Sequence, residues 1–91
     1  MKNSDLKYLE KILKALANQR RLAILKFLKS KKEASVGDIA SEINLSVKAT
    51  SKHLYILSSI DILEKEKKSL QIFYKLSNNQ SPVVKQFLSL L

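Results

Sequence analysis

The sequence places two short helices almost end to end, and this arrangement leaves few folds open to the chain. Ser35, with Asp38 three residues later, is typical of a helix start, and Ser46 is a second candidate N-cap. Asn44 is suited to end the first helix, so only two residues separate the pair. Short helices joined so closely form a helix-turn-helix, which we place at residues 35–58.

Apolar residues recur at helical spacing on both sides of this turn. Successive helical residues are about 100° apart, so each helix buries one stripe and leaves the opposite side free to face outward. The expected buried stripes are Val36, Ile39, Ala40 and Ile43 in the first helix, and Val47, Thr50, Leu54 and Leu57 in the second.

Two more helices are expected before the helix-turn-helix. Residues 1–17 carry leucines and isoleucine at three- and four-residue spacing, with Ser4 or Asp5 as the start. Asn18 is a good N-cap for the next helix. That helix runs into the basic residues of 29–32, which suit the negative end of the helix dipole.

Beyond residue 59 the pattern changes from helix to strand. Ile62–Lys67 and Gln71–Leu76 read as two strands of a hairpin, a wing covering residues 62–76. No Asn-Gly or Gly-Gly pair marks its turn, so the register stays open. Ser81 as N-cap and Pro82 at the first helical position then predict a final helix.

These elements predict a mainly α fold with a small β-hairpin, in the order α-α-α-α-β-β-α. Ninety-one residues suit one domain, residues 1–91. A helix-turn-helix followed by a two-stranded wing is a winged helix. In that fold the second helix enters the DNA major groove and the hairpin lies against the backbone or minor groove.

The charge of the chain favours a polyanionic partner. Its formal net charge is +9, and residues 1–32 alone hold ten basic and two acidic residues. Lysine-rich helices also occur with their lysines simply exposed to solvent, so the position of these lysines on the fold must decide whether they bind a partner. Cysteine is absent, which excludes disulfides and thiolate metal sites. No targeting signal or membrane-length apolar run is apparent, and we expect a cytoplasmic protein that does not enter membranes.

The outer face of the second helix-turn-helix helix is the candidate DNA-reading surface. No acidic residue accompanies its lysines before Asp61. Short polar and basic side chains there can reach phosphates and base edges, although ordinary surface lysines would give the same pattern. The candidates are Ser46, Lys48, Ala49, Ser51, Lys52, His53 and Tyr55.

Three residues of this helix need separate treatment. Ser51 and His53 point about 200° apart on a helix, so they cannot act as a nucleophile and its base. For His53 a packed or capping role and a phosphate contact both stay open. Ile56 lies about 40° from Lys52 on the helical wheel. Another helix and a thymine methyl are its two candidate contacts.

The wing has a modestly basic tip. Its lysines alternate with Glu64 and Glu66, a pattern that can also protect a strand edge from aggregation. Both interpretations stay open, and Lys67 and Lys68 are the candidate DNA-backbone contacts.

Three segments together carry a family resemblance. Leu16–Leu25, with Arg21, resembles the start of the second helix in the arsenic-repressor (ArsR-type) family of winged-helix transcription regulators. Ser51–Leu54 is similar to the recognition-helix signature of that family, and Ile72–Leu76 to its second wing strand. The resemblance covers Ile12–Leu76 and implies an operator-binding homodimer that most often represses. Arg21 is then a candidate DNA-backbone contact.

The resemblance also implies that the dimer is built mainly by the first and last helices, residues 1–17 and 81–91. Both helices carry more apolar surface than a three-helix core with a wing should need. The expected interface residues are Leu6, Leu9, Leu13, Leu16, Val84, Phe87, Leu88 and Leu91.

The chain departs from the metal-sensing members of that family. It has Ser35-Val36-Gly37 where they carry a Cys-Val-Cys motif, and Pro82–Leu91 holds neither a carboxylate side chain nor a histidine. We therefore expect no metal site and no other cofactor. Asp61 occupies a position that is usually glycine in the family, and Asp tolerates the left-handed conformation less well.

The leading interpretation is a sequence-specific, dimeric DNA-binding regulator, a repressor that does not respond to metals. A winged-helix protein-interaction module is the main alternative, and it should show an apolar recognition face. Nonspecific binding to nucleic acid is a third possibility. An enzyme is not expected, because the chain has no Gly-rich phosphate loop, no cysteine, one histidine and no convergent pair of acids.

Overall fold

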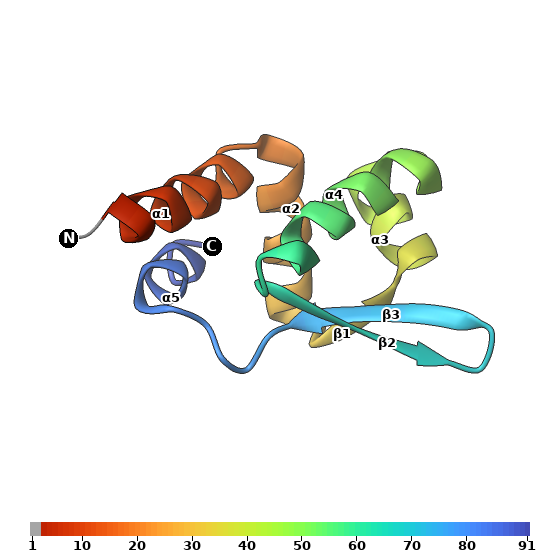
Figure 1. Cartoon of the computed structure of the whole chain (residues 1–91). Coiled ribbons are helices and arrows are strands. Elements are labelled where there is room, and N and C mark those ends of the chain that lie inside the picture. The colour runs from red at the N-terminus through yellow and green to blue at the C-terminus, as the bar shows by residue number, and fades with distance from the viewer. Residues whose placement is uncertain (1–2) are drawn as a thin grey trace.

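The computed structural model describes residues 3–91, with side chains from residue 5 onward. Within this range the fold has five helices and one three-stranded antiparallel sheet of order β1-β3-β2 (Figure 1). The winged helix-turn-helix is confirmed. The elements are α1 (Asn3–Leu16), α2 (Gln19–Lys31), β1 (Glu33–Ser35), α3 (Val36–Ile43), α4 (Val47–Ser59), β2 (Leu63–Lys68), β3 (Gln71–Leu76) and α5 (Pro82–Leu88).

Side-chain caps set the helix starts around the helix-turn-helix. Ser35 and Ser46 each accept a hydrogen bond from the backbone N–H three residues later, at 3.2 and 3.1 Å. Asn18 accepts hydrogen bonds from the backbone N–H groups of Arg20 and Arg21 at the start of α2. Asn44 ends α3 in the left-handed conformation, with φ 56°. Only α1 starts earlier than predicted, since it already includes Asn3.

The sheet has one strand more than the predicted hairpin. The three-residue strand β1 pairs antiparallel with β3, and Ala34 lies opposite Tyr74. Both side chains are buried. The added strand satisfies backbone groups along the edge of β3 that a two-stranded wing would leave unpaired.

The hairpin register follows from a two-residue turn. Lys68 pairs with Gln71, and Ser69 opens the turn with φ 58°. The strand β2 is therefore shifted one residue from the predicted Ile62–Lys67. Asp61, just before it, has φ 62°, the left-handed conformation considered for this position.

The hydrophobic core lies between the helices and the inner face of the sheet. Val47, predicted to belong to the buried stripe of α4, is 55% exposed, because it opens the helix one turn before Thr50, its first fully buried residue. No helix in the described range is long and apolar enough to cross a membrane. The most completely buried side chains are Ile12, Ile24, Leu25, Leu28, Ile39, Thr50, Leu54, Leu57, Ile62 and Val84.

Candidate nucleic-acid interface

The outer face of α4 gathers most of the predicted DNA-reading residues. Thr50, Leu54 and Leu57 are fully buried on its inner side. The opposite side carries no acidic residue and presents Lys48 and Lys52 to solvent. Ala49 and Ser51 beside them are half-buried, and Tyr55 is 72% exposed. Val47, which sequence reasoning assigned to the core, is also exposed. Ser46 caps the helix at its start, with its hydroxyl bonded to the Ala49 N–H.

The guanidinium of Arg21, predicted to contact the DNA backbone, makes hydrogen bonds within the chain. Its Nε donates to the Ala15 carbonyl at 2.6 Å and its Nη2 to the Lys14 carbonyl at 3.2 Å. Its Nη1 lies 3.1 Å from His53 Nδ1. Burial lowers the pKa of this guanidinium, which nevertheless stays charged. Arg21 therefore ties the end of α1 to α4.

His53 is the acceptor in this contact, because a guanidinium can only donate. Burial is the main cause that lowers its pKa below the ordinary 6.5, and the charges of Arg21 and Arg20 add to the effect. The ring is half-buried and neutral at pH 7. Of the two roles left open for His53, the structure fits the packed one, and a cationic phosphate contact is not supported.

Ile56 faces another helix. It lines a groove together with Lys11, Lys14 and Ala15 of α1. Ile56 therefore lies beside α1 and keeps 37% of its surface exposed.

The wing holds one of its two candidate lysines in an internal pair. Lys68 Nζ donates to Glu33 Oε1 at 2.7 Å and lies 5.3 Å from the centre of the Phe73 ring. The hydrogen bond to Glu33 raises the pKa of Lys68. Lys68 thus joins β2 to β1 through a partly exposed ion pair, whereas Lys67 is exposed beside the tip. Sequence reasoning missed the pair because Glu33 belongs to the strand that it did not predict.

The apolar surface that the end helices expose is smaller than the dimer interface predicted from the sequence. Leu16, Val84 and Leu88 are buried in the core of the single chain, so they cannot form the interface that was predicted for them. Their stripes pack α1 and α5 onto the rest of the fold. Two exposed apolar residues that sequence reasoning missed are Tyr8 of α1 and Leu90, which follows α5. The exposed apolar residues of the two end helices and the segment after α5 are Leu6, Tyr8, Leu13, Phe87 and Leu90, with Leu9 and Leu91 half-buried.

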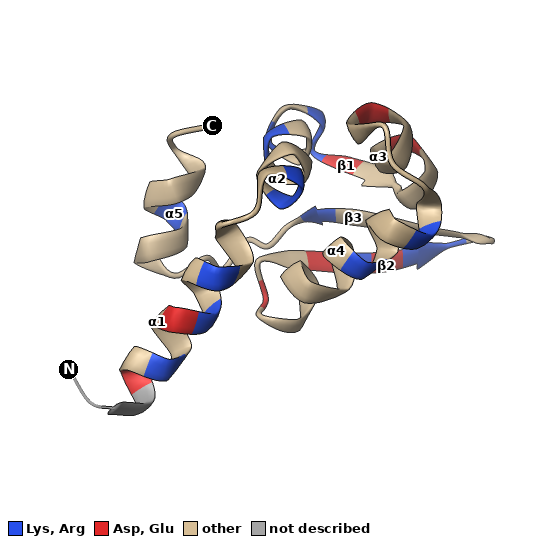
Figure 2. Ribbon diagram, turned by 90° about the horizontal axis from the view of Figure 1, so that it is seen from above, with Lys and Arg blue, Asp and Glu red and all other residues tan. Residues whose placement is uncertain are grey.

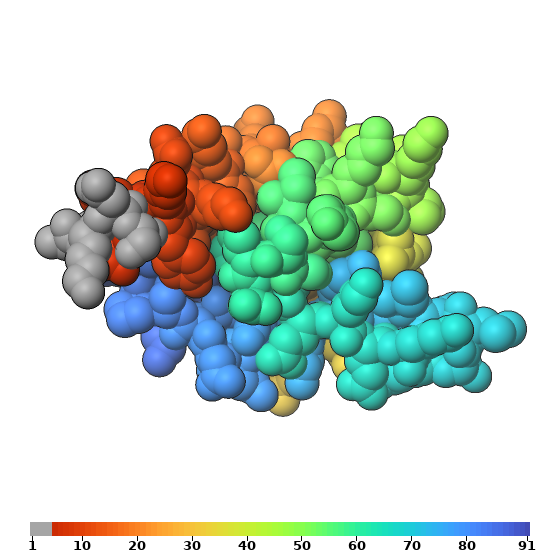
Figure 3. All heavy atoms as spheres, in the orientation of Figure 1, coloured from red at the N-terminus to blue at the C-terminus, as the bar shows by residue number. Residues whose placement is uncertain are grey.

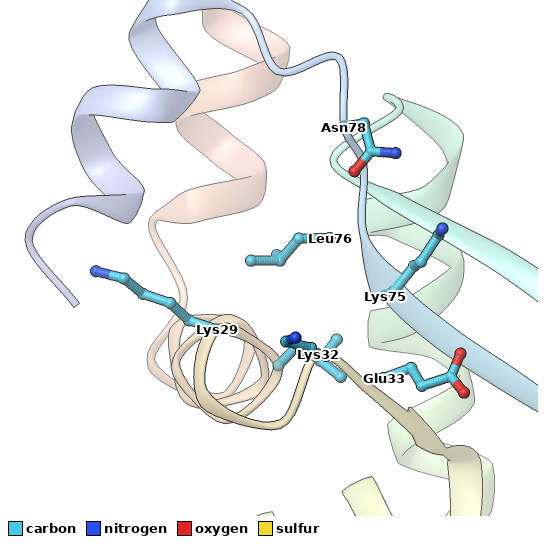
Figure 4. A pocket seen from close by; sticks show the side chains of 7 residues that line it. Lys29, Lys32, Glu33, Lys75, Leu76 and Asn78 are labelled. Atoms are coloured by element: carbon cyan, nitrogen blue, oxygen red, sulfur yellow. The ribbon is translucent and has the colours of Figure 1, made fainter.

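A basic hollow of about 520 Å³ lies elsewhere, between the end of α2, the end of β3 and the segment after it. Lys29, Lys32 and Lys75 line it together with Glu33. Figure 4 shows the Lys29 and Lys75 side chains pointing away from one another. Lys29 Nζ donates to the Leu88 carbonyl of α5. These lysines do not converge on one point, so we assign no ligand to this hollow.

Basic segments lie on α1, on α4 and near the tip of β2, as Figure 2 shows from above. A helix-turn-helix with a basic, acid-free outer face on its second helix, followed by a hairpin, defines the DNA-binding winged-helix proteins. Residues 18–65 match the family described as "Bacterial regulatory protein, arsR family". The chain belongs to this family of transcriptional regulators, and the resemblance noted in the sequence is confirmed.

Named relatives agree with this assignment. The chain is 40% identical over 80 residues to the transcriptional activator HlyU of Vibrio cholerae, covering 88% of this chain and 70% of HlyU. It is 33% identical over 66 residues to the transcriptional repressor SdpR of Bacillus subtilis, covering 72% of each.

Solved structures show the same fold. Reduced HlyU from Vibrio cholerae matches with a TM-score of 0.80 and 38% identity, over 97% of this chain and 88% of that one. The homodimeric winged helix-turn-helix DNA-binding domain of Mb0332 from Mycobacterium bovis matches with a TM-score of 0.81 and 28% identity, over 96% and 77%.

Proposed function

We propose that this chain is a sequence-specific regulator that binds operator DNA as a homodimer, with α4 in the major groove. The observation that carries the proposal is the acid-free outer face of α4, where Lys48 and Lys52 stand exposed beside Ser51. Residues 1–91 then form one winged domain, with residues 1–17 and 81–91 supplying the dimer contacts. The description of Mb0332 as homodimeric supports this arrangement.

Two groups of side chains have different tasks in this proposal. Lys48, Ser51 and Lys52 read base edges or the adjoining phosphates, with Ala49 and Tyr55 beside them. Lys67 on the wing contacts backbone only. Arg21 and His53 hold α4 in place through contacts within the chain, and Lys68 is paired with Glu33 in the sheet.

Selection of binding sites from a random duplex pool tests the proposal directly. Two copies of α4 in successive major grooves should enrich an inverted repeat with half-site centres about 10 bp apart. A pool that shows no common sequence after selection contradicts specific binding.

Substitutions separate base reading from positioning. Lys52→Ala or Ser51→Ala should weaken binding to the selected site by roughly 1 to 3 kcal/mol per site and lower the ratio of specific to nonspecific affinity. Lys67→Ala should weaken both kinds of DNA equally and make the salt slope of the dimer shallower by about 2. If no α4 substitution changes the ratio, the exposed Val47 and Tyr55 favour a protein-interaction module instead.

We further propose that the dimer represses and that its DNA binding does not depend on a metal. The chain contains no cysteine, its one histidine contacts Arg21, and the described residues hold no cluster of three metal-ligating side chains. Zinc or a chelator should leave the operator affinity within about twofold, and a reproducible tenfold change contradicts metal independence. Transcription in vitro from a promoter that carries the selected site shows whether the protein represses or activates. An increase in transcription contradicts the proposal that it represses.

A further inference from the structure

A groove of about 390 Å³ runs between α1 and the carboxyl-terminal half of α4. Two lysines and one arginine line it, with apolar and hydroxyl side chains between them, and none of the lining residues is acidic. We call it the α1–α4 groove, and its lining is Lys11, Lys14, Ala15, Arg21, Ile56, Ser59 and Ile60.

The lysines of this groove belong to one stripe of α1. Lys7, Lys11 and Lys14 follow one another at four- and three-residue spacing, and all three are exposed. Glu10 forms an ion pair with this stripe, and its carboxylate lies 4.0 Å from Lys14 Nζ. Both side chains of that pair are mostly exposed, at 66% and 77%, so solvent screens it. The positive charge of the stripe therefore stays available to a ligand.

The α1–α4 groove continues the proposed DNA-reading face. Figure 3 shows α1, α4 and the wing side by side on one face of the molecule. The reading residues lie in the first half of α4, whereas Ile56 and Ser59 of the groove lie near its end. Arg21 bonds to carbonyls at the end of α1 and to His53 of α4, which fixes the two walls relative to one another.

We propose that the α1–α4 groove binds DNA-backbone phosphates in the operator segment between the two half-sites, through Lys11 and Lys14. This inference depends on the proposed function, in which α1 lies next to the dimer axis and α4 reads each half-site. Lysine suits the task because its ammonium is a mobile point charge that can pair with any backbone phosphate. The contact therefore adds affinity on any sequence.

The K11Q/K14Q variant tests the contact against K26Q/K31Q, which removes the same charge from exposed lysines of α2. Those control lysines lie beside Glu42, on surfaces away from the α1–α4 groove. Binding is measured by fluorescence anisotropy at several salt concentrations, on the selected duplex and on a mixed-sequence duplex of equal length. A dimer of K11Q/K14Q lacks four lysines, so its salt slope should be shallower by about 2 to 4 on both duplexes, while the control keeps the wild-type slope.

Neutral methylphosphonate linkages placed between the half-sites locate the contact without changing the protein. They should weaken wild-type and K11R/K14R binding several-fold and have little further effect on K11Q/K14Q. Equal slopes for K11Q/K14Q and K26Q/K31Q overturn the proposal, as does an undiminished methylphosphonate effect in K11Q/K14Q. If selection yields no common site, the proposed function fails by itself, and the mixed-sequence duplex still tests the α1–α4 groove.

Discussion

Arg21 joins three helices through one guanidinium. It belongs to α2, donates to two carbonyls at the end of α1, and contacts the imidazole of His53 on α4. Carbonyls in the last turn of a helix have no partner within that helix, so a charged donor is favourable there. Arg21, which lies in one of the segments that resemble the family, thus acts here through the packing of α4 against α1 and α2.

Replacing Arg21 should therefore cost stability. Arg21→Ala removes the hydrogen bonds of a charged donor and should lower the free energy of unfolding by roughly 1 to 3 kcal/mol, measured by urea titration. Arg20→Ala is the matched control, because it removes the same charge from an exposed neighbour and should change stability by less than about 0.5 kcal/mol. If both substitutions lower the free energy of unfolding equally, the loss comes from the positive charge and not from the hydrogen bonds of Arg21.

His53 should make stability depend on pH. Its pKa is lower in the folded chain than the ordinary 6.5, so the unfolded chain binds more protons as the pH falls below that value. The free energy of unfolding should decrease from about pH 6.5 down to the folded-state pKa and be fully present above pH 6.5. His53→Gln should flatten this decrease in urea titrations. An imidazole pKa at or above 6.5 in an NMR titration would contradict the expectation.

The candidate site contains exposed residues of α4, whose positions could be predicted from the sequence, and residues with distant partners, whose contacts could not. The outer face of α4 is the complement of a buried stripe, so the positions of Lys48 and Lys52 follow from helical periodicity. His53, which contacts Arg21, and Glu33, which pairs with Lys68, lie 32 and 35 residues away along the chain, and only the packed fold brings them together. Local spacing therefore predicts which side of α4 is exposed, but it gives no information on the intrachain partners of Arg21 and Lys68.

At the scale of elements, capping residues were the most reliable signals. Ser35, Ser46 and Asn18 all cap through their side chains, as predicted. The strand β1 was missed because three residues carry no measurable period, and its partner β3 lies about 40 residues further on. Helix α5 ends at Leu88, earlier than the stripe to Leu91 suggested.

The cap of α4 gives a prediction at this scale. Ser46→Ala removes the acceptor of the Ala49 N–H and should lower the free energy of unfolding by about 1 kcal/mol. Ser81→Ala is a matched control, because the Ser81 hydroxyl makes no capping hydrogen bond at the start of α5. Its effect should stay below about 0.5 kcal/mol in the same thermal or urea unfolding measurement. If Ser81→Ala lowers the free energy of unfolding as much as Ser46→Ala does, the effect comes from replacing a serine at a helix start and not from losing the capping hydrogen bond.

The whole molecule is elongated, with principal extents of 42 × 24 × 23 Å. The end helices α1 and α5 lie at one end and the wing at the other (Figure 1). A dimer joined through the end helices therefore leaves both copies of α4 and both wings free for DNA. The exposed apolar residues of α1 and α5 favour that junction over one through the wing, which is charged along β2.

The mass in solution tests this arrangement. Light scattering at micromolar concentration should give twice the 10.4 kDa of the chain. Phe87→Asp places a charge among the outward apolar residues of α5 and should shift the mass toward 10.4 kDa, since an unpaired charge is costly to bury in an interface. Leu70→Asp is the control, because Leu70 at the wing tip is 95% exposed and should leave the dimer intact. A wild-type mass near 10.4 kDa, or equal masses for wild type and a folded Phe87→Asp variant, contradicts a dimer built on the end helices.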